Sequence, residues 1–195
     1  ESNLLTHRDA MFCGDPINGT ENRAVLHAAL RSEQGDLRTS EDRDRNTTIN
    51  QQLEHVRQFS EKVRNGSWHG STGKAVTDVV NIGIGGSNFG PKMVTQALRS
   101  YADSTIRVHF ISNIDGVEIA EILRPLNAEH VLFVVASKTF TTIETMTNAK
   151  SARDWMAKAV TAPAQQFVAL SSAQEKTAAF GIAPDRVFVF ADWVG

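Results

Sequence analysis

Two hydrophobic patterns alternate along the chain from residue 76 onward. Short apolar runs rich in β-branched residues, without alternating polar positions, occur at 76–82, 106–111, 131–136, 166–170 and 187–190. Stretches with helical periodicity separate them, at about 90–101, 115–124, 142–159 and 172–180. Such runs are typical of strands buried on both faces, and strands that alternate with helices form parallel sheets. The pattern predicts an α/β fold: a three-layer αβα sandwich with a five-stranded parallel sheet.

The residues before this region are expected to be mainly helical. Residues 20–32 carry one apolar helical stripe, and apolar positions recur at helical spacing over 47–65. Residues 33–46 are polar and dense in charge, which indicates a solvated loop. We therefore expect a helical lead-in segment, residues 1–75, followed by a flavodoxin-like domain, residues 76–195.

Composition narrows the class of protein. Of 195 residues, 41% are hydrophobic and 22% charged, as in a soluble globular domain. The net charge of −2 leaves no broad basic field for nucleic acid or an anionic membrane, and the longest apolar run, 131–136, is too short to span a bilayer. The single cysteine, Cys13, cannot form an internal disulfide. We expect a cytoplasmic protein without nucleic-acid or membrane partners, and the sequence at both ends suggests a piece of a longer protein.

Ligands of open parallel sheets gather where strands lead into helices, and two of these junctions are unusual. The first follows the run 76–82 and contains Gly85, Gly86 and Ser87. Glycine lets the backbone turn sharply and present bare N–H groups at a helix start, which attracts an oxyanion. We expect the helix to begin around Gly90-Pro91. A tight turn that merely connects strand and helix is the alternative.

The second junction, Ser137-Lys-Thr-Phe-Thr-Thr142, places four hydroxyls and one ammonium group in six residues at a helix start. The alternative is a capping box between Thr141 and Glu144, but such a cap uses only two residues. Hydroxyls and N–H groups at the positive end of a helix dipole form a phosphate cradle. Parallel strands would bring both junctions to one edge of the sheet, so we expect them to bind one phosphate together.

The phosphate is expected to belong to a small metabolite and not to a nucleotide. The dinucleotide-binding pattern fails because Asn88 occupies the position of its third glycine. The P-loop pattern fails because Ala75 follows Gly73-Lys74, where Ser or Thr is needed. The six histidines show no metal-ligand spacing, and Cys13 has no evident neighbouring base. The sequence therefore predicts neither a metal nor a redox cofactor.

With both junctions considered, the chain resembles the glucose-6-phosphate isomerase family, whose SIS domain holds a sugar phosphate. The matching segments follow the family's order: 17–27, 79–87, 112–116, 136–149 and 192–195. Departures are mild, with Asn88-Phe89 where the family usually has Asp-Leu and Ile143 where it usually has Gln. The missing carboxylate at position 88 should not hurt anion binding.

The resemblance implies which residues contact the substrate. Gly86 and Ser87 would touch the sugar phosphate. The phosphate itself would be gripped by Ser137, Lys138, Thr139 and Thr142. Phe140 and Thr141 would complete this loop, and Glu144 resembles an auxiliary carboxylate near the family's ring-opening histidine.

The resemblance also implies an isomerisation, in glycolysis and gluconeogenesis, that needs neither metal nor redox cofactor. Acid–base groups open the ring of glucose 6-phosphate, and a glutamate then moves a proton between C2 and C1 through a cis-enediol. An arginine stabilises the developing negative charge. In the family these groups lie C-terminal to the segment that matches 192–195, so they are expected outside this chain. The family enzyme is a homodimer whose active site borrows a residue from the second subunit.

Three other functions remain open. A regulatory SIS domain would sense a sugar phosphate without chemistry, although the matches outside the two junctions favour the enzyme. A redox enzyme would need a dinucleotide site, but the sequence matches neither the dinucleotide-binding pattern nor the P-loop pattern. The third alternative is a related sugar-phosphate isomerase, or an isomerase that also accepts mannose 6-phosphate. The sequence does not separate it from a glucose-6-phosphate isomerase, because most residues that recognise the sugar are expected outside the chain.

Overall fold

The structure is a computed structural model that describes residues 3–31, 40–102 and 105–194. Two compact units are formed, one by residues 57–189 and the other by residues 1–56 together with 190–195. Within the described residues, no helix combines the length and the apolar character needed to cross a membrane.

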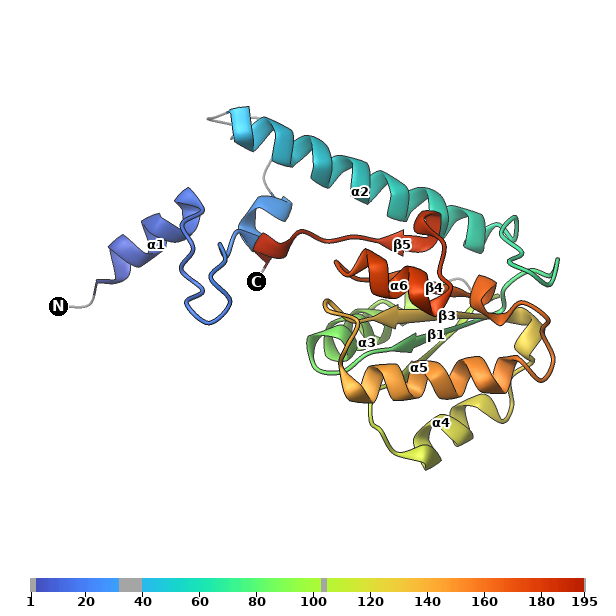
Figure 1. The fold of residues 1–195 in the computed structure, drawn as a ribbon. Helices are drawn as coiled ribbons and strands as arrows, with labels where there is room; N and C mark the ends of the chain where they lie inside the picture. Colours follow the sequence, from blue (N-terminus) through green and yellow to red (C-terminus); the bar gives the residue numbers. More distant parts are fainter. Residues whose placement is uncertain (1–2, 32–39, 103–104, 195) are drawn as a thin grey trace. The chain divides into compact units, whose positions relative to one another are not determined.

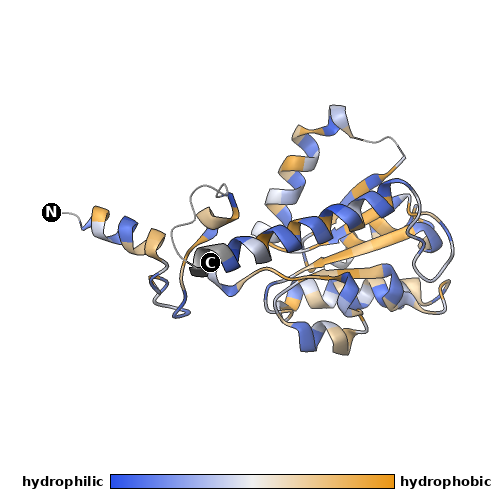
Figure 2. Cartoon of the chain, turned by 90° about the horizontal axis from the view of Figure 1, so that it is seen from above, coloured by the Kyte–Doolittle hydropathy of each residue, from blue (hydrophilic) through white to orange (hydrophobic). Residues whose placement is uncertain are grey.

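The larger unit is built on a parallel sheet of five strands in the order β2-β1-β3-β4-β5 (Figure 1). The strands are β1 (Asp78–Ile82), β2 (Arg107–Ile111), β3 (Val131–Ala136), β4 (Phe167–Leu170) and β5 (Val187–Phe188). Each lies within the apolar run expected for it, and Figure 2 shows the strands as largely hydrophobic. The expected α/β fold with a five-stranded parallel sheet is confirmed.

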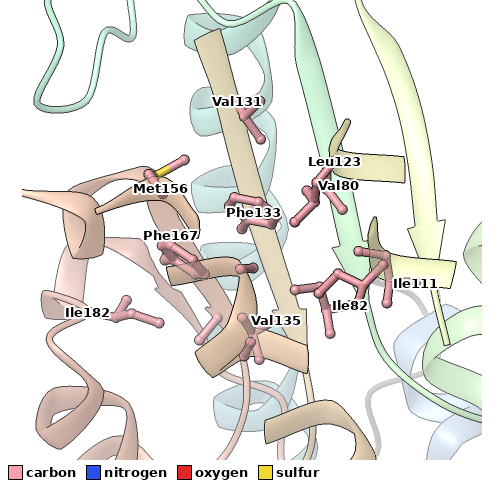
Figure 3. Packing of buried hydrophobic residues seen from close by; sticks show 14 of the residues in the cluster. Val80, Ile82, Ile111, Leu123, Val131, Phe133, Val135, Met156, Phe167 and Ile182 are labelled. Atoms are coloured by element: carbon pink, nitrogen blue, oxygen red, sulfur yellow. The ribbon is translucent and has the colours of Figure 1, made fainter. Parts of the chain in front are cut away.

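Helices connect these strands and cover the sheet. They are α3 (Gly86–Ala97), α4 (Gly116–Leu123), α5 (Ile143–Met156) and α6 (Gln174–Phe180), with 3-10 helices η3 (Arg99–Tyr101), η4 (Ala128–His130), η5 (Pro163–Gln166) and η6 (Pro184–Arg186). Side chains of α4, α5 and α6 pack on one face, where Phe133 stacks on Phe167 with ring centroids 4.8 Å apart (Figure 3). On the other face, Val63 at the end of α2 (Ser40–Arg64) packs with Leu132 and Val168. Both faces of the central strands β1 and β3 are therefore buried, which explains their apolar runs, whereas the edge strand β2 is partly exposed.

Helix α3 starts earlier than the sequence pattern indicates, at Gly86 instead of around Gly90, and Pro91 lies inside it. Proline has no N–H, so the carbonyl of Ser87, one turn before it, loses its normal helical partner. The side-chain amide of the buried Asn81 donates to that carbonyl instead, at 3.0 Å. This hydrogen bond replaces the one that Pro91 cannot make, and it connects the first turn of α3 to β1.

The smaller unit contains α1 (Leu4–Cys13), η1 (His27–Arg31), the first part of α2 and η7 (Asp192–Val194). Gly14 ends α1 in the left-handed conformation with φ 81°. The N–H of Leu26 donates to the carbonyl of Trp193 at 2.8 Å, which joins the chain's early and late residues.

The N-terminal expectations were partly wrong. The apolar pattern did not predict α1. Of the described residues 20–31, only η1 is helical, and Arg23 instead pairs with Asn18 as an antiparallel bridge. Helix α2 begins at Ser40, so the part of the expected loop after that residue is helical, and residues 32–39 lie outside the described residues. The division of the chain into segments 1–75 and 76–195 stays a prediction.

A cluster of charged side chains joins the amino ends of β1 and β2. Asp78 is 1% exposed and accepts from Arg107 Nε at 2.8 Å and Nη2 at 2.7 Å. His109 Nε2 and Thr77 Oγ1 donate to the same carboxylate, each at 2.8 Å. Burial alone would raise the pKa of Asp78, but the hydrogen bonds from Arg107, His109 and Thr77 outweigh it and lower this pKa to about 2.

Replacing this carboxylate should cost stability in a pH-dependent way. Asp78→Asn is expected to lower the free energy of unfolding at neutral pH by about 1–3 kcal/mol, because the amide cannot accept from both arms of Arg107. The folded-state pKa lies below the unfolded value of about 3.9, so the carboxylate stabilises the fold above about pH 4 and progressively less as the pH falls toward 2. Urea unfolding at neutral pH and at about pH 3 measures the difference.

The matched control is Asp154→Asn, which removes an exposed carboxylate on α5. It should have little effect at either pH. An Asp78→Asn penalty that is the same at both pH values would contradict the ion-pair assignment.

Candidate functional site

The loops that follow β1 and β3 lie at the same edge of the sheet (Figure 1). The two strands are parallel neighbours, with Ile82 opposite Val135. The chain leaves β1 for β2 on one side and then returns to β3 on the other. Such a switch point, at the carboxyl ends of the strands, forms the crevice in which open α/β sheets bind ligands. Residues 83–87 (the glycine loop) and residues 137–142 (the hydroxyl loop) follow the two strands that flank it.

Close backbone contacts shape the glycine loop. Gly83 is buried, and a Cβ there would lie 2.8 Å from the Cβ and the carbonyl oxygen of Ser87. Gly85 has φ 56° and ψ −126°, which residues with a Cβ rarely adopt. Gly86 is exposed, and a Cβ there would meet nothing within 4 Å. The fold therefore requires glycine at 83 and 85, whereas the described structure gives no packing reason for the glycine at 86.

The four hydroxyls of the hydroxyl loop form two pairs. Ser137 Oγ lies 3.2 Å from Thr142 Oγ1, and Thr139 Oγ1 lies 2.7 Å from Thr141 Oγ1. Ser137 is 4% exposed, while Thr139 and Thr141 are exposed. In each pair either oxygen can donate, and one hydroxyl proton suffices for the bond between them. The second proton of each pair can therefore point to a further acceptor.

The capping-box interpretation of this loop is wrong. The N-cap of α5 is Thr142, and its side chain makes no capping hydrogen bond. The hydroxyl of Thr141 pairs with Thr139 instead, and Glu144 lies half-buried in the first turn of the helix. Side-chain capping therefore does not explain why the hydroxyls are there. The positive end of the α5 dipole lies beside these hydroxyls.

Phe140 anchors the hydroxyl loop in the core. It is 4% exposed, and its ring packs against Phe180 at 5.8 Å between centroids. Its φ of 52° is unusual for a residue with a side chain, and the burial of the ring holds it there. The N–H of Phe140 donates to the carbonyl of Ser137 at 3.3 Å, which closes a turn. Phe140 therefore maintains the loop both through the packing of its ring and through the turn that its backbone closes.

Residues after β4 support the hydroxyl loop, and sequence reasoning missed them. The carbonyl of Lys138 accepts hydrogen bonds from Ser171 and Ser172. Two consecutive serines at the carboxyl end of a predicted strand were the signal that could have found them. Lys138 itself is half-buried and Ser171 is fully buried.

The segment 112–116, one of the stretches that resemble the isomerase family, is held by hydrogen bonds with α4 and α5. Glu118 accepts from the N–H of Ser112 at 3.2 Å and of Asn113 at 2.7 Å. The buried Asn148 of α5 donates to the carbonyl of Asn113 at 2.7 Å. These bonds connect the loop after β2 to α5, so this segment has a structural role at the same edge of the sheet.

Two buried oxygens beside the site have no hydrogen-bond partner within the described part of the chain: Asn88 Oδ1 in the first turn of α3 and Thr145 Oγ1 in the first turn of α5. Unpaired buried polar groups are uncommon and need an explanation where they occur.

No cluster of three or more potential metal ligands among His, Cys, Asp and Glu occurs within the described ranges.

Comparison with known proteins identifies the family. The family model of phosphoglucose isomerase matches residues 1–195. The glucose-6-phosphate isomerase of Methylococcus capsulatus is 54% identical over 198 residues, and that of Chlorobium luteolum is 50% identical over 198 residues. A glucose-6-phosphate isomerase structure from Chlamydia trachomatis superimposes with a TM-score of 0.76 at 30% identity over 99% of this chain. A hypothetical protein from Thermus thermophilus, at 23% identity and a TM-score of 0.60, shares the fold over 74% of the chain.

These matches cover the whole chain but only part of each relative. Both bacterial sequences align with 100% of this chain and with 36% of their own length, and the Chlamydia structure is covered over 37% of its chain. The matched region includes the glycine loop, the hydroxyl loop and the segments outside them. The chain belongs to the phosphoglucose isomerase family.

Proposed function

We propose that this chain supplies the phosphate-binding loops of an enzyme that interconverts glucose 6-phosphate and fructose 6-phosphate. The observation that carries the proposal is the position of the glycine loop and the hydroxyl loop, which follow neighbouring strands at the switch point of the sheet. Both loops lead directly into helices, α3 and α5, so N–H groups and the positive ends of two helix dipoles lie at one crevice.

Each residue of the two loops has a distinct task in this proposal. Gly86 and Ser87 contact the substrate, where the absence of a Cβ at 86 allows close approach. Hydroxyl protons, the ammonium group and loop N–H groups bind the phosphate oxygens, with the side chains supplied by Ser137, Lys138, Thr139 and Thr142. Phe140 and Thr141 maintain the loop through core packing and the hydroxyl pair with Thr139.

The chemical step follows from the substrate. Conversion of an aldose to a ketose needs ring opening and proton transfer between C2 and C1 through a cis-enediol, with stabilisation of the negative charge that develops. We place the groups for these steps outside this chain, with Glu144 as an auxiliary carboxylate beside the substrate. The chain's own contribution is to fix the phosphate, which orients C1 and C2 toward those groups. We propose a cytoplasmic homodimer as the acting form.

A regulatory domain that senses a sugar phosphate is the second candidate. It would use the same cradle, so the loops alone do not separate the two functions. The match to isomerases extends over residues 1–195, including segments that lie far from the loops in sequence, and this favours the enzyme.

Residues 1–195 by themselves should bind a sugar phosphate weakly and isomerise none. The reason is that the proton-transferring groups are placed outside the chain. A coupled assay for conversion of fructose 6-phosphate, run on the purified chain and on the full-length enzyme, measures this. Turnover by the isolated chain above the buffer rate would show that its own residues suffice for the chemistry.

Replacing Ser137 and Thr139 by Ala in the full-length enzyme should raise KM. The double variant removes two hydroxyl donors from the phosphate, at a cost of about 1–3 kcal/mol of binding free energy. Because the phosphate is held equally in the ground state and the transition state, kcat should change much less. Steady-state kinetics in both directions measure the two constants.

The matched control is the double variant Thr147→Ala and Ser151→Ala, which removes the same two hydroxyl types from exposed positions on α5. It should leave KM unchanged. If the Ser137 and Thr139 variant also keeps the original KM, the hydroxyl loop does not bind the phosphate.

A further inference from the structure

The turn between β4 and α6 is bonded to the hydroxyl loop at a single carbonyl group. The carbonyl oxygen of Lys138 accepts from Ser172 N–H at 3.1 Å, Ser172 Oγ at 2.9 Å and Ser171 Oγ at 3.0 Å. The next carbonyl, of Thr139, accepts from Lys176 Nζ at 3.3 Å. Three donors at one carbonyl oxygen exceed its two lone pairs. The orientation of the Lys138–Thr139 peptide is therefore strongly constrained.

The serines are themselves fixed by the sheet. Ser171 is fully buried, and its N–H donates to the carbonyl of Phe188 at 3.1 Å. Its hydroxyl accepts from the N–H of Ala173 at 3.1 Å, so its proton is directed to Lys138. On the other strand, the N–H of Ser137 donates to the carbonyl of Leu170 at 3.1 Å. The turn and the hydroxyl loop thus continue the pairing of β3 with β4.

The orientation of this carbonyl determines where the next N–H points. The described residues contain no cis peptide bond, and in a trans peptide the C=O and the following N–H point in opposite directions. The Lys138 carbonyl points toward the end of β4, so the N–H of Thr139 points away from β4. In the sheet order β1-β3-β4, the side of β3 away from β4 is the side of β1 and its glycine loop.

The N–H of Thr139 is available as a donor. Within the described part of the chain it makes no hydrogen bond, whereas the N–H groups of Ser137 and Phe140 in the same loop are used internally. A backbone N–H held in place by the fold loses little entropy when an anion binds it.

We propose that Ser171 and Ser172 are positioning residues for the phosphate site. They hold the Lys138 carbonyl on the β4 side, so that the N–H of Thr139 faces the switch point and donates to the sugar phosphate. This inference rests on the proposed function, because it assumes that the hydroxyl loop binds the phosphate. It extends the site to a third loop whose side chains do not touch the substrate.

The test compares three variants of the full-length enzyme, with inorganic phosphate as a competitive inhibitor. Ser171→Ala together with Ser172→Ala removes both side-chain donors and should raise the inhibition constant for phosphate and the KM about 3- to 10-fold, the effect of one or two neutral hydrogen bonds. The value of kcat should stay within about twofold, since the phosphate is not the reacting group. The single variant Ser172→Thr keeps a hydroxyl and should keep the inhibition constant and the KM of the unaltered enzyme. Ser151→Ala on α5 is the surface control.

Stability is measured in parallel, because a merely structural role would lower the melting temperature without moving the inhibition constant. That result would overturn the proposal. Ser172 is exposed and Ser172→Ala keeps the backbone donor, so this single variant replaces the double one if the latter does not fold, with an expected effect of about twofold or more. An unchanged inhibition constant in this variant would equally overturn the proposal.

The same variants distinguish the positioning role of Ser171 and Ser172 from phosphate binding by the hydroxyl loop. If Ser137→Ala with Thr139→Ala raises the inhibition constant for phosphate and the Ser171 and Ser172 variants do not, the positioning role is wrong and the proposed function stands. If inorganic phosphate does not compete with the substrate, or the Ser137 and Thr139 variant leaves its inhibition constant unchanged, the proposed function fails, and the positioning role with it.

Discussion

The parallel pairing of β1 with β3 places the two loops beside each other, and the candidate site depends on it. Adjacent strands lie about 4.8 Å apart, so the loops after Ile82 and Ala136 begin within reach of one small anion. A sheet in which β2 lay between them would double that separation. The chain satisfies the constraint by running from β1 to the edge strand β2 and returning past β1 to β3. The apolar residues that bury both faces of these strands therefore also determine the geometry of the loops.

Both loops are held from behind by side-chain donors at strand ends. Asn81, at the end of β1, binds the carbonyl of Ser87, which Pro91 leaves without a helical partner. Ser171, just after β4, binds the carbonyl of Lys138. At Lys138 the carbonyl is bonded away from the crevice, and the trans peptide then directs the N–H of Thr139 to the opposite side. The N–H of Asn88, which follows Ser87, instead donates to the carbonyl of Gly85 at 3.0 Å. The arrangement at Lys138 pre-orients a donor before a ligand arrives, which reduces the entropy lost on binding.

Local sequence rules failed at three positions, each for its own reason. Pro91 is a good first-turn residue by propensity, yet it lies inside α3 because one amide side chain replaces the missing bond. Thr141 and Glu144 have the spacing of a capping box, but the hydroxyl of Thr141 pairs with Thr139. The start of α2 was missed because the sequence of residues 40–46 is polar and charged and carries no apolar stripe.

The sequence by itself determined the layer architecture and the order of strands and helices along the chain, because buried strands give uninterrupted apolar runs and the helices between them keep a helical period. It also indicated the two loops, since glycines and clustered hydroxyls at strand ends are unusual compositions. Only the tertiary structure decided the strand order, the start of α3 and the contacts of Ser171 and Ser172 with Lys138. The strand order and the contacts of Lys138 depend on residues far apart in the chain, such as Lys138 and Ser172, and a local pattern does not show which distant residue it will contact.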